Sequence, residues 1–535
     1  MKKLASLLFV VLAVFMLQAF FATTAMAEKK IVWAQPIDVT THDRQLGSIV
    51  SDANVNCLYS EGLVRIHHGK VLPGIAESWD IQNNGQTYIF HLRKSVWHDG
   101  TPLTAHAFEY TFKRLVDPNT GSKYAIIADI IKDAVRIIDG EMPPSALGVK
   151  AIDDTTLQID IEYPADFLLL ILNSGVFYPV NQDYVKKYGK DYASSPDKLA
   201  YNGPYILKEH NTQESNVLVR NPMYWNANAV KLDMIEMLVI PDEGTALTLF
   251  ENGDIDLARV PSHLFDKYSS KSTPTGGNPE WMYINTRRKA EKPWLGNKNF
   301  IKAIGYAIDR QEYADLSSRG RDVPLSRFIL PILTGKNTTY GDDYPLSFFP
   351  VKGDQAEAKK YLAAALKELN LKSPSDISVD YQIMDNPEAR RAGEAMQSIL
   401  TKNLGIKVNV APVDHKRIWA SMNEGTFDLS WARYAADYDS PYSYLTLVYS
   451  GHLLARRTGY SNKAFDALFD TIKSTSGRDN ILNKYYEAEK ILMADTMPIV
   501  PVKLVRSAYL MNPKLKNVVF SFVNFWFDLA FADKQ

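Results

Sequence analysis

The chain has 535 residues, of which 46% are hydrophobic and 23% are charged, and its formal net charge is −1. This balance excludes a disordered chain and offers no basic footprint for nucleic acid or for an anionic membrane surface. The length exceeds what one hydrophobic core supports, so we expect about two to four lobes. The aromatic fraction of 11% suits either packed cores or a cavity lined with amphipathic rings, and composition leaves both open.

The first residues have the pattern of a secretory signal. Met1-Lys2-Lys3 precedes an apolar run at 4–21, and the small residues Ala25-Met26-Ala27 follow it. We therefore expect residues 1–27 to be a signal peptide cleaved after Ala27, which makes Glu28 the mature N-terminus and places the protein in the periplasm. Because the apolar run is long, an uncleaved membrane anchor is the alternative.

The N-terminal half alternates short strands with turns. Residues 31–34 predict a strand, and residues 35–52 have no clear period and predict a loop. Asn84-Gly85 predicts a hairpin turn between two strands. Thr104 is the expected N-cap of a helix. The apolar residues of this helix recur at helical spacing: Phe108, Phe112 and Leu115.

Short motifs follow one another in a fixed order along the chain. They are Ala76-Glu77-Ser78-Trp79, Thr87-Tyr88-Ile89-Phe90-His91-Leu92-Arg93, His98-Asp99-Gly100-Thr101-Pro102-Leu103-Thr104-Ala105, Asn202-Gly203-Pro204-Tyr205, Arg220-Asn221-Pro222-Met223-Tyr224-Trp225 and Ala307-Ile308-Asp309-Arg310. This series resembles the large solute-binding receptors of bacterial ABC importers for peptides, nickel and related ligands. Asp117-Pro118-Asn119-Thr120 with Tyr124, and Ala436-Asp437-Tyr438, look especially like the oligopeptide receptors of that family.

The resemblance implies an α/β, two-lobed periplasmic-binding-protein fold of the cluster C type, with an extra domain, mixed sheets and a hinge between the lobes. Lobe I is expected at residues 28–59, 185–285 and 503–535. Lobe II, the extra domain, is expected at 60–184, and lobe III, the second ligand-binding lobe, at 286–502. Because the tail returns to lobe I, the chain crosses between the lobes at least twice, as a hinge requires.

The strongest local prediction lies in lobe III. Residues 377–383 and 406–410 predict strands on either side of a helix at 387–404, which is bounded by a proline start and a glycine stop. Such a βαβ unit has parallel strands, and ligands gather outside the carboxyl ends of parallel strands. A further strand at 427–431 would deliver residues 433–437 to that edge.

The segment from Phe427 to Tyr444 passes from an alternating strand into acids and tyrosines. Asp439-Ser440-Pro441 predicts a helix start with Ser440 as N-cap, which leaves Asp437 without a capping role. From the residues alone, Asp437 is either the partner of a ligand cation or a solvated turn acid.

The resemblance assigns roles to this segment and to two others. It implies that Asp437 pairs with the α-ammonium of a peptide and that Tyr124 supplies a nearby hydroxyl. A peptide backbone can add to strand edges whatever its side chains are. The resemblance implies such edges at Ala432 to Ala435 and at Ser48, Ile49 and Val50. Tyr434 is then a pocket wall, with core packing as the alternative.

The resemblance fails where arginines would bind the ligand's C-terminal carboxylate. Met422 and Trp431 occupy those positions. Arg433 shares a strand face with Trp431, and Arg319 and Arg321 lie in a polar loop. An unpaired ligand charge in a dry cleft is costly, so either one of these arginines, Arg433 first, replaces the missing anchors or the carboxylate lies in water or elsewhere. We expect a ligand range shifted toward peptides with an extra acidic group or an unusual linkage.

Together these patterns favour a receptor that delivers oligopeptides to the permease subunits of an inner-membrane ABC importer. The sequence holds no nucleophile elbow, P-loop or zinc-binding helix motif, and Cys57 is its only cysteine. We expect no catalytic residue, cofactor, metal or nucleic-acid partner, and a monomer. The alternatives are a receptor for a cell-wall (murein) peptide or another small solute, a periplasmic chaperone, and a glycoside-cleaving enzyme that uses Asp437 and Asp439.

Overall fold

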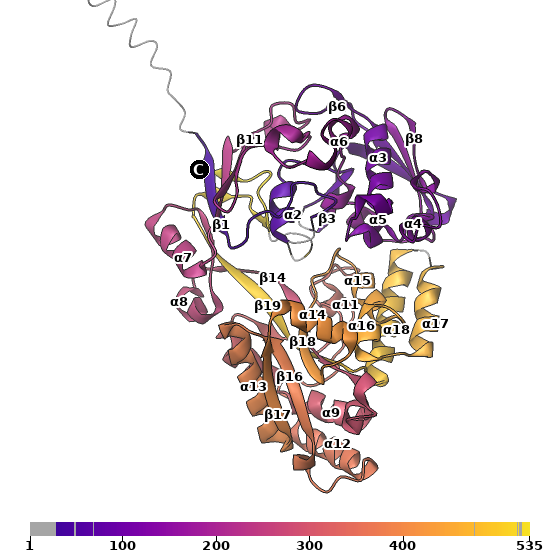
Figure 1. Ribbon diagram of the computed structural model, residues 1–535, viewed down its shortest axis with the longest axis vertical. Coiled ribbons are helices and arrows are strands. Elements are labelled where there is room, and N and C mark those ends of the chain that lie inside the picture. The colour runs from indigo at the N-terminus through magenta and orange to yellow at the C-terminus, as the bar shows by residue number, and fades with distance from the viewer. Residues whose placement is uncertain (1–27, 48–49, 68, 476, 522, 524–526) are drawn as a thin grey trace, which may run out of the picture.

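The computed structural model describes residues 28–47, 50–67, 69–475, 477–521, 523 and 527–535. Figure 1 shows an upper part, indigo to magenta, above a lower part that is mostly orange, with β14 (Thr273–Ile284) and β19 (Ile499–Met511) running between them. The predicted two-lobed α/β fold with mixed sheets is confirmed. The expected signal peptide at 1–27 lies outside the described residues.

Within the described residues, eleven strands form one sheet that extends through both parts of the molecule. Its order is β10-β11-β12-β1-β13-β19-β14-β18-β16-β17, and β15 pairs with β19 off this path. The upper part contributes β1 (Lys30–Gln35), β10 (Tyr205–Asn211), β11 (Ser215–Arg220), β12 (Met234–Val239) and β13 (Leu257–Arg259). The lower part contributes β15 (Val323–Pro324), β16 (Ser378–Met384), β17 (Lys407–Val413) and β18 (Leu429–Arg433). The antiparallel β14 and β19 join the lobes in one hydrogen-bonded ladder.

The predicted βαβ unit of lobe III is confirmed. β16 and β17 are parallel, and α13 (Pro387–Leu404) connects them. The Asn386 side chain accepts a hydrogen bond from the Ala389 amide, Pro387 follows it, and Gly405 ends the helix at φ 71°. β18 lies parallel to β16 on its other side, so the carboxyl ends of all three strands share one edge.

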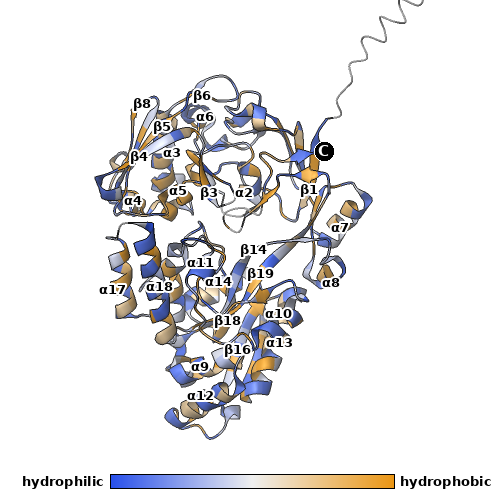
Figure 2. Ribbon diagram, turned by 180° about the vertical axis from the view of Figure 1, so that it is seen from behind, coloured by the Kyte–Doolittle hydropathy of each residue, from blue (hydrophilic) through white to orange (hydrophobic). Residues whose placement is uncertain are grey.

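Amphipathic helices cover this sheet. α9 (Lys298–Ala307) and α12 (Gln355–Glu368) pack with α13 around a core that contains Ile301, Ile304 and Ile308. Figure 2 shows hydrophilic and hydrophobic residues alternating along these helices. That alternation is typical of helices with one face in water and one in a core.

Lobe II holds a separate sheet in the order β4-β5-β9-β8. These strands are β4 (Ala76–Gln82), β5 (Thr87–Leu92), β8 (Val149–Asp153) and β9 (Thr156–Asp160), and α3 (Ala105–Val116) packs on them. The apolar residues predicted for α3 are fully buried: Phe108, Phe112 and Leu115. The predicted hairpin joins β4 to β5, although its turn is longer than the two-residue type because Asn83, Asn84 and Gly85 all have positive φ.

The remaining elements are shorter or connect the lobes. The helices are α2 (Val50–Asn56), α4 (Ala134–Ile138), α5 (Leu168–Ile171), α6 (Gln182–Tyr188), α7 (Glu243–Asn252), α8 (Phe265–Tyr268), α10 (Arg310–Ser318), α11 (Tyr340–Asp343), α14 (His415–Glu424), α15 (Tyr442–Leu445), α16 (Leu453–Thr458), α17 (Lys463–Ile472) and α18 (Arg478–Ala494). The strands are β2 (Val64–His67), β3 (Lys70–Pro73), β6 (Ser95–Val96), β7 (Pro102–Leu103), β20 (Leu515–Lys516), β21 (Val519–Phe520), β22 (Phe527–Asp528) and β23 (Asp533–Lys534).

The C-terminal tail returns to lobe I, as predicted. β19 pairs with β13, and Lys534 Nζ lies 2.8 Å from Asp256 Oδ2. None of the described helices combines the length and the apolar character that a bilayer crossing requires.

Candidate functional site

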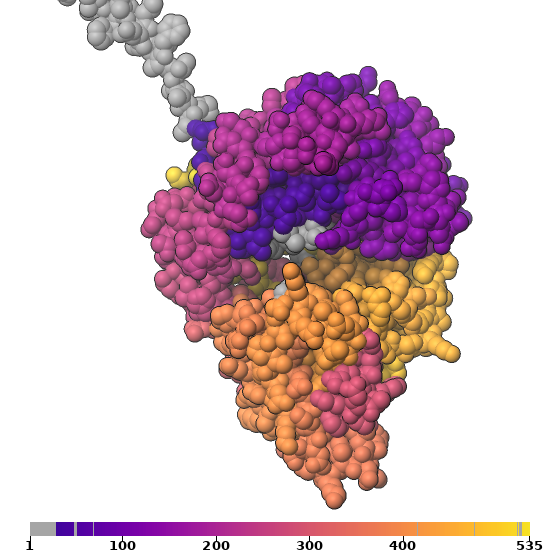
Figure 3. Space-filling model, in the orientation of Figure 1, coloured from indigo at the N-terminus to yellow at the C-terminus, as the bar shows by residue number. Residues whose placement is uncertain are grey.

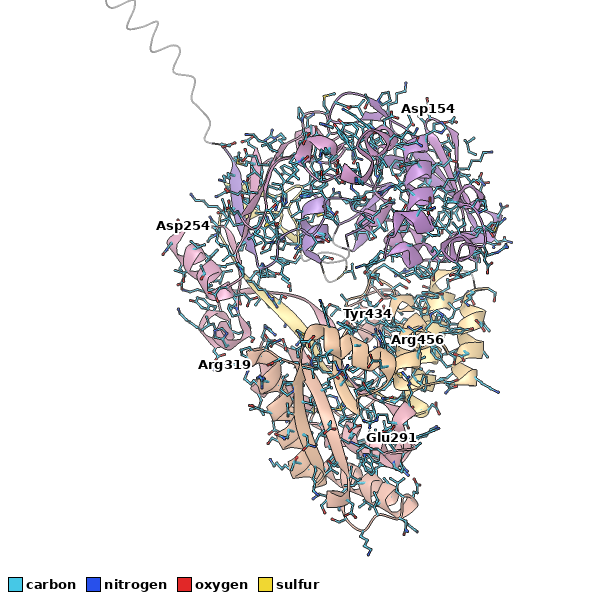
Figure 4. The ribbon with its side chains drawn as sticks, viewed as in Figure 1. Asp154, Asp254, Glu291, Arg319, Tyr434 and Arg456 are labelled. Atoms are coloured by element: carbon cyan, nitrogen blue, oxygen red, sulfur yellow. The ribbon has the colours of Figure 1, made fainter. Side chains whose placement is uncertain are left out.

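Asp437 is held by two tyrosines. The Tyr434 hydroxyl donates to its Oδ2 at 2.6 Å, and the Tyr124 hydroxyl donates to its Oδ1 at 2.7 Å. The backbone amide of Asp437 donates to Ser443 Oγ at 3.3 Å. The structure thus brings together Asp437, Tyr124 and Tyr434, three residues singled out from the sequence. Figure 4 shows Tyr434 at the edge of the lower part that faces the upper part.

The carboxylate of Asp437 has polar partners but no cationic one within the described ranges. Burial raises its pKa above the ordinary range, and the hydrogen bonds from Tyr434 and Tyr124 offset only part of that effect. A carboxylate that is buried in this way is stabilised when a positive charge comes next to it. The group is therefore electrostatically suited to an ammonium brought by a ligand.

Asp437 lies on the wall of a cavity of about 190 Å³. Residues from lobes I, II and III and from both long connecting strands line it, so it lies between the lobes. The lining includes Arg44, Asp52 and Asn56 of lobe I, Tyr124 and Asn173–Val176 of lobe II, Ala435–Asp437 of lobe III, Thr275–Asn278 of β14, and Val505 and Ser507 of β19. Figure 3 shows the hollow between the upper and lower parts.

The connecting strands are irregular where they line the cavity. Pairing of β14 with β19 shifts register between Thr275 and Asn278, at Gly276 and Gly277. A Cβ on Gly277 would lie 2.6 Å from the Leu504 side chain, so the close approach of the strands requires glycine there. Such a bulge bends a strand locally, and here it does so at the floor of the cavity.

Lobes II and III also touch through aromatic rings beside the cavity. Phe167 stacks on Tyr438 and Tyr442, with ring centroids 5.2 Å and 4.5 Å away. The hydroxyls of Tyr163 and Tyr442 are 2.7 Å apart, and Arg478 lies 3.4 Å from Asp166. With the bond from Tyr124 to Asp437, these contacts join lobes II and III.

The residues before Asp437 follow strand alternation. In β18, Ala432 pairs with Trp281 of β14, and its side chain is buried on the same face as Tyr434. Pairing of β18 with β16 covers Leu429 and Ser430. Ala435 follows the strand and is exposed on the cavity wall.

Arg433, the expected anchor of a ligand carboxylate, is paired with an acid of the protein. Arg433 Nε donates to Glu280 Oε2 at 2.9 Å, and its guanidinium lies 5.1 Å from the Trp431 ring centroid. Both side chains lie on the strand face opposite to Tyr434, and neither lines the cavity. Arg433 is thus paired with an acid of β14, on a half-buried strand face that lies away from the cavity.

The two loop arginines are engaged as well. Arg319 pairs with Asp266 at 3.2 Å and lies at the outer side of the lower part, away from Tyr434 (Figure 4). Arg321 is buried and pairs with Asp322 and Glu388. Met422 is buried in the core of lobe III.

Two other expectations about local structure change. Val50 begins helix α2, so it does not offer the strand edge expected there, while Ser48 and Ile49 lie outside the described residues. α15 begins at Tyr442, and Pro441 precedes it in the cap position. Ser440 Oγ still accepts a hydrogen bond from the Tyr442 amide at 3.3 Å, so the predicted helix start is one residue early.

Several cavity residues escaped the sequence analysis. Gly276 and Gly277 form a pair that signals a bulge, but nothing local indicates that the bulge faces a cavity. Arg44 lies in the aperiodic stretch between β1 and α2, where no pattern assigns a face to any side chain. That the glycine pair and Arg44 line a cavity follows only from the three-dimensional packing of segments that are far apart in the chain.

Comparison with known proteins identifies relatives of the whole fold. A family model described as bacterial extracellular solute-binding proteins, family 5, matches residues 70–452. The chain is 30% identical over 503 residues to the periplasmic oligopeptide-binding protein OppA of Escherichia coli K12, covering 92% of this chain and 90% of OppA. It is also 30% identical over 470 residues to the periplasmic murein peptide-binding protein MppA of the same organism, covering 85% and 84%.

A solved structure has the same arrangement. Listeria monocytogenes OppA bound to peptide superimposes with a TM-score of 0.77 at 27% identity, covering 95% of this chain and 99% of that one.

Proposed function

Because the chain belongs to family 5 of the bacterial extracellular solute-binding proteins, we propose that it is a periplasmic receptor that encloses a peptide and delivers it to the permease subunits of an inner-membrane ABC importer. In this proposal the protein is a monomer without cofactor or catalytic residue, and cleavage after Ala27 releases it into the periplasm. The lobe boundaries expected from the sequence belong to the same proposal.

The observation that carries the proposal is the carboxylate of Asp437. It lies on the wall of a cavity between lobes, is raised in pKa by burial and has two tyrosine donors but no cation among the described residues. The α-ammonium of a peptide would supply the missing charge. A buried charge gains most from a partner that is both charged and hydrogen-bonding.

The peptide backbone would extend from this point along β18. Among the described residues, pairing of β18 with β16 stops at Ser430, while pairing with β14 continues to Arg433. Residues 432–435 therefore offer main-chain groups on one side, to which an extended ligand can add as a strand. Tyr434 then acts as a wall that also orients Asp437.

Calorimetric titration with trialanine and N-acetyltrialanine tests the proposal. We expect acetylation to lower the affinity by about two to four decades, because it removes the positive charge of the α-ammonium that pairs with Asp437. Equal affinity for both peptides would contradict the role of Asp437. Absence of binding to either peptide would contradict a receptor for short peptides.

A receptor for a cell-wall peptide is the second candidate, and the similarity to MppA favours it. Native mass spectrometry of the protein as purified distinguishes the two candidates. A retained mass that fits a peptide containing diaminopimelate would favour the cell-wall peptide, and a mixture of ordinary peptides would favour the general receptor.

A further inference from the structure

Arg44 is a buried cation on the cavity wall whose hydrogen bonds are incomplete. The residue is 3% exposed, and Nη1 donates to the Pro179 carbonyl at 2.6 Å. Its Nε and Nη2 are buried and have no hydrogen-bond partner among the described residues. The guanidinium carbon lies 5.7 Å from the ring centroid of Tyr59, and Arg44 is among the residues that line the cavity.

Other buried arginines among the described residues are engaged by protein oxygens. Three of them pair with carboxylates: Arg65 with Glu61 and Asp528, Arg321 with Asp322 and Glu388, and Arg327 with Glu489. Arg310 has no such acid, but its three nitrogens all donate to backbone carbonyls. Arg457 donates from Nε to the side-chain oxygen of Asn423 at 3.0 Å, and none of its nitrogens is both buried and unpartnered. Arg44, with two buried nitrogens that lack a partner among the described residues, differs from these five.

Leaving guanidinium donors unpaired in a protein interior costs free energy. Native structures satisfy most buried polar groups, and an unsatisfied group at a ligand cavity indicates a partner that comes from outside. The planar fork of an arginine matches the two oxygens of a carboxylate. Nε and Nη2, the two nitrogens that remain, form one edge of that fork.

Asn56 offers a second donor in the same cavity. Its Oδ1 accepts a hydrogen bond from the Tyr59 hydroxyl, which leaves Nδ2 as a donor without a partner among the described residues. Asp52, the acid that this segment contributes to the lining, accepts hydrogen bonds at both oxygens from Thr40, at 2.7 Å and 2.8 Å. The Asp52 carboxylate is thus bound by Thr40 of the preceding loop, whereas Arg44 and Asn56 each have donors that a ligand can use.

We propose that Arg44, assisted by Asn56, is the anion subsite of the cavity and binds a carboxylate of the peptide ligand. This inference rests on the proposed function and deepens it: Asp437 binds the cationic end and Arg44 an acidic group. The carboxylate comes either from the C-terminus or from an acidic side chain. The subsite takes the place that the sequence analysis assigned to Arg433.

The test compares matched peptides on the unmutated protein, Arg44→Met and Arg44→Gln. Trialanine against trialanine amide probes the C-terminus, and Ala-Glu-Ala amide against Ala-Gln-Ala amide probes a side chain. Arg319→Met removes an exposed arginine that is remote from the cavity and serves as the control variant. Affinities are measured by calorimetry, and folding is followed by thermal denaturation.

For the unmutated protein and Arg319→Met, we expect one carboxylate peptide to bind about 10- to 100-fold more tightly than its neutral match. In Arg44→Met this ratio falls to about one, because the carboxylate peptide loses affinity while the neutral peptide binds as before. The pair that shows the ratio identifies the source of the carboxylate.

Three outcomes would overturn the inference. The first is an undiminished ratio in Arg44→Met, which would place the carboxylate elsewhere. The second is a ratio of one for both pairs in the unmutated protein. If Arg44→Met fails to fold, Arg44→Gln, which keeps an amide donor for the Pro179 carbonyl but not the positive charge, carries the test, and an undiminished ratio there is the third. If the unmutated protein binds none of the peptides, acetylated or not, the proposed function itself is contradicted.

Discussion

Tyr124 and Asp437 are joined by a hydrogen bond of 2.7 Å although 313 positions separate them in the chain. Tyr124 belongs to lobe II and Asp437 to lobe III, so this bond spans the side of the cavity on which the lobes meet. The carboxylate that we assign to the ligand ammonium is therefore also a contact between lobes. In this proposal, the Asp437 carboxylate both binds the ligand ammonium and contributes a contact between the lobes.

Asp437→Asn should abolish the preference for a free α-ammonium. The amide keeps the size of the side chain but not its charge, so trialanine should lose about two to four decades of affinity, while N-acetyltrialanine should change little. Calorimetric titration measures both. Asp183→Asn, which neutralises an exposed acid of lobe II, is the control and should bind as the unmutated protein does. Similar losses for both peptides would contradict the assignment.

The stability of the ligand-free protein should depend on pH through Asp437. Burial raises the folded-state pKa of Asp437 above its ordinary value of 3.8, so the folded state binds a proton more readily than the unfolded state. Its stabilising contribution is then complete below that ordinary value and is lost as pH rises through the raised one. Thermal unfolding should show the unmutated protein gaining stability relative to Asp437→Asn as pH falls. A constant difference would contradict the raised pKa.

Phe167→Ala should favour the open arrangement of the lobes. The ring is stacked between Tyr438 and Tyr442 of lobe III, and its removal takes away apolar contact that exists only when the lobes meet. Small-angle scattering should give a larger radius of gyration without ligand, and trialanine should restore compactness only at higher concentration. Phe112→Ala, a change within the lobe II core, should lower the melting temperature without this expansion. Unchanged scattering would remove Phe167 from the closing contact.

The mature protein should begin at Glu28. Ala25 and Ala27 are small, as a signal peptidase requires, and no cysteine stands directly after them to accept a lipid. Intact-mass measurement of periplasmic material decides this. A mass that retains residues 1–27 would favour the membrane anchor instead.

Local patterns predicted the elements that carry their own signals. α13 was placed at its observed bounds because Asn386-Pro387 and Gly405 mark the two ends chemically. The parallel pairing of β16, β17 and β18 followed from a helix between two strands. With the family resemblance, this was enough to bring Asp437 to the edge of the sheet.

The side of the fold that a side chain faces was harder to predict than the position of its helix or strand. Alternation correctly put Trp431 and Arg433 on one face of β18, but it did not say whether that face met the cavity or the core. Glu280, which pairs with Arg433, comes from β14, a strand that no local rule aligns with β18. Arg44 was missed for the related reason that its surroundings, Tyr59 and the Pro179 carbonyl, come from distant segments.

The walls of the cavity include β14 and β19, the strands that connect the lobes. A ligand that contacts residues of both connecting strands and of the lobes would lose several of these contacts together when the lobes part. In the proposed receptor, its release would then depend on bending of the connecting strands as well as on its affinity. A transport partner that separates the lobes would therefore release the ligand without forming hydrogen bonds to the ligand itself.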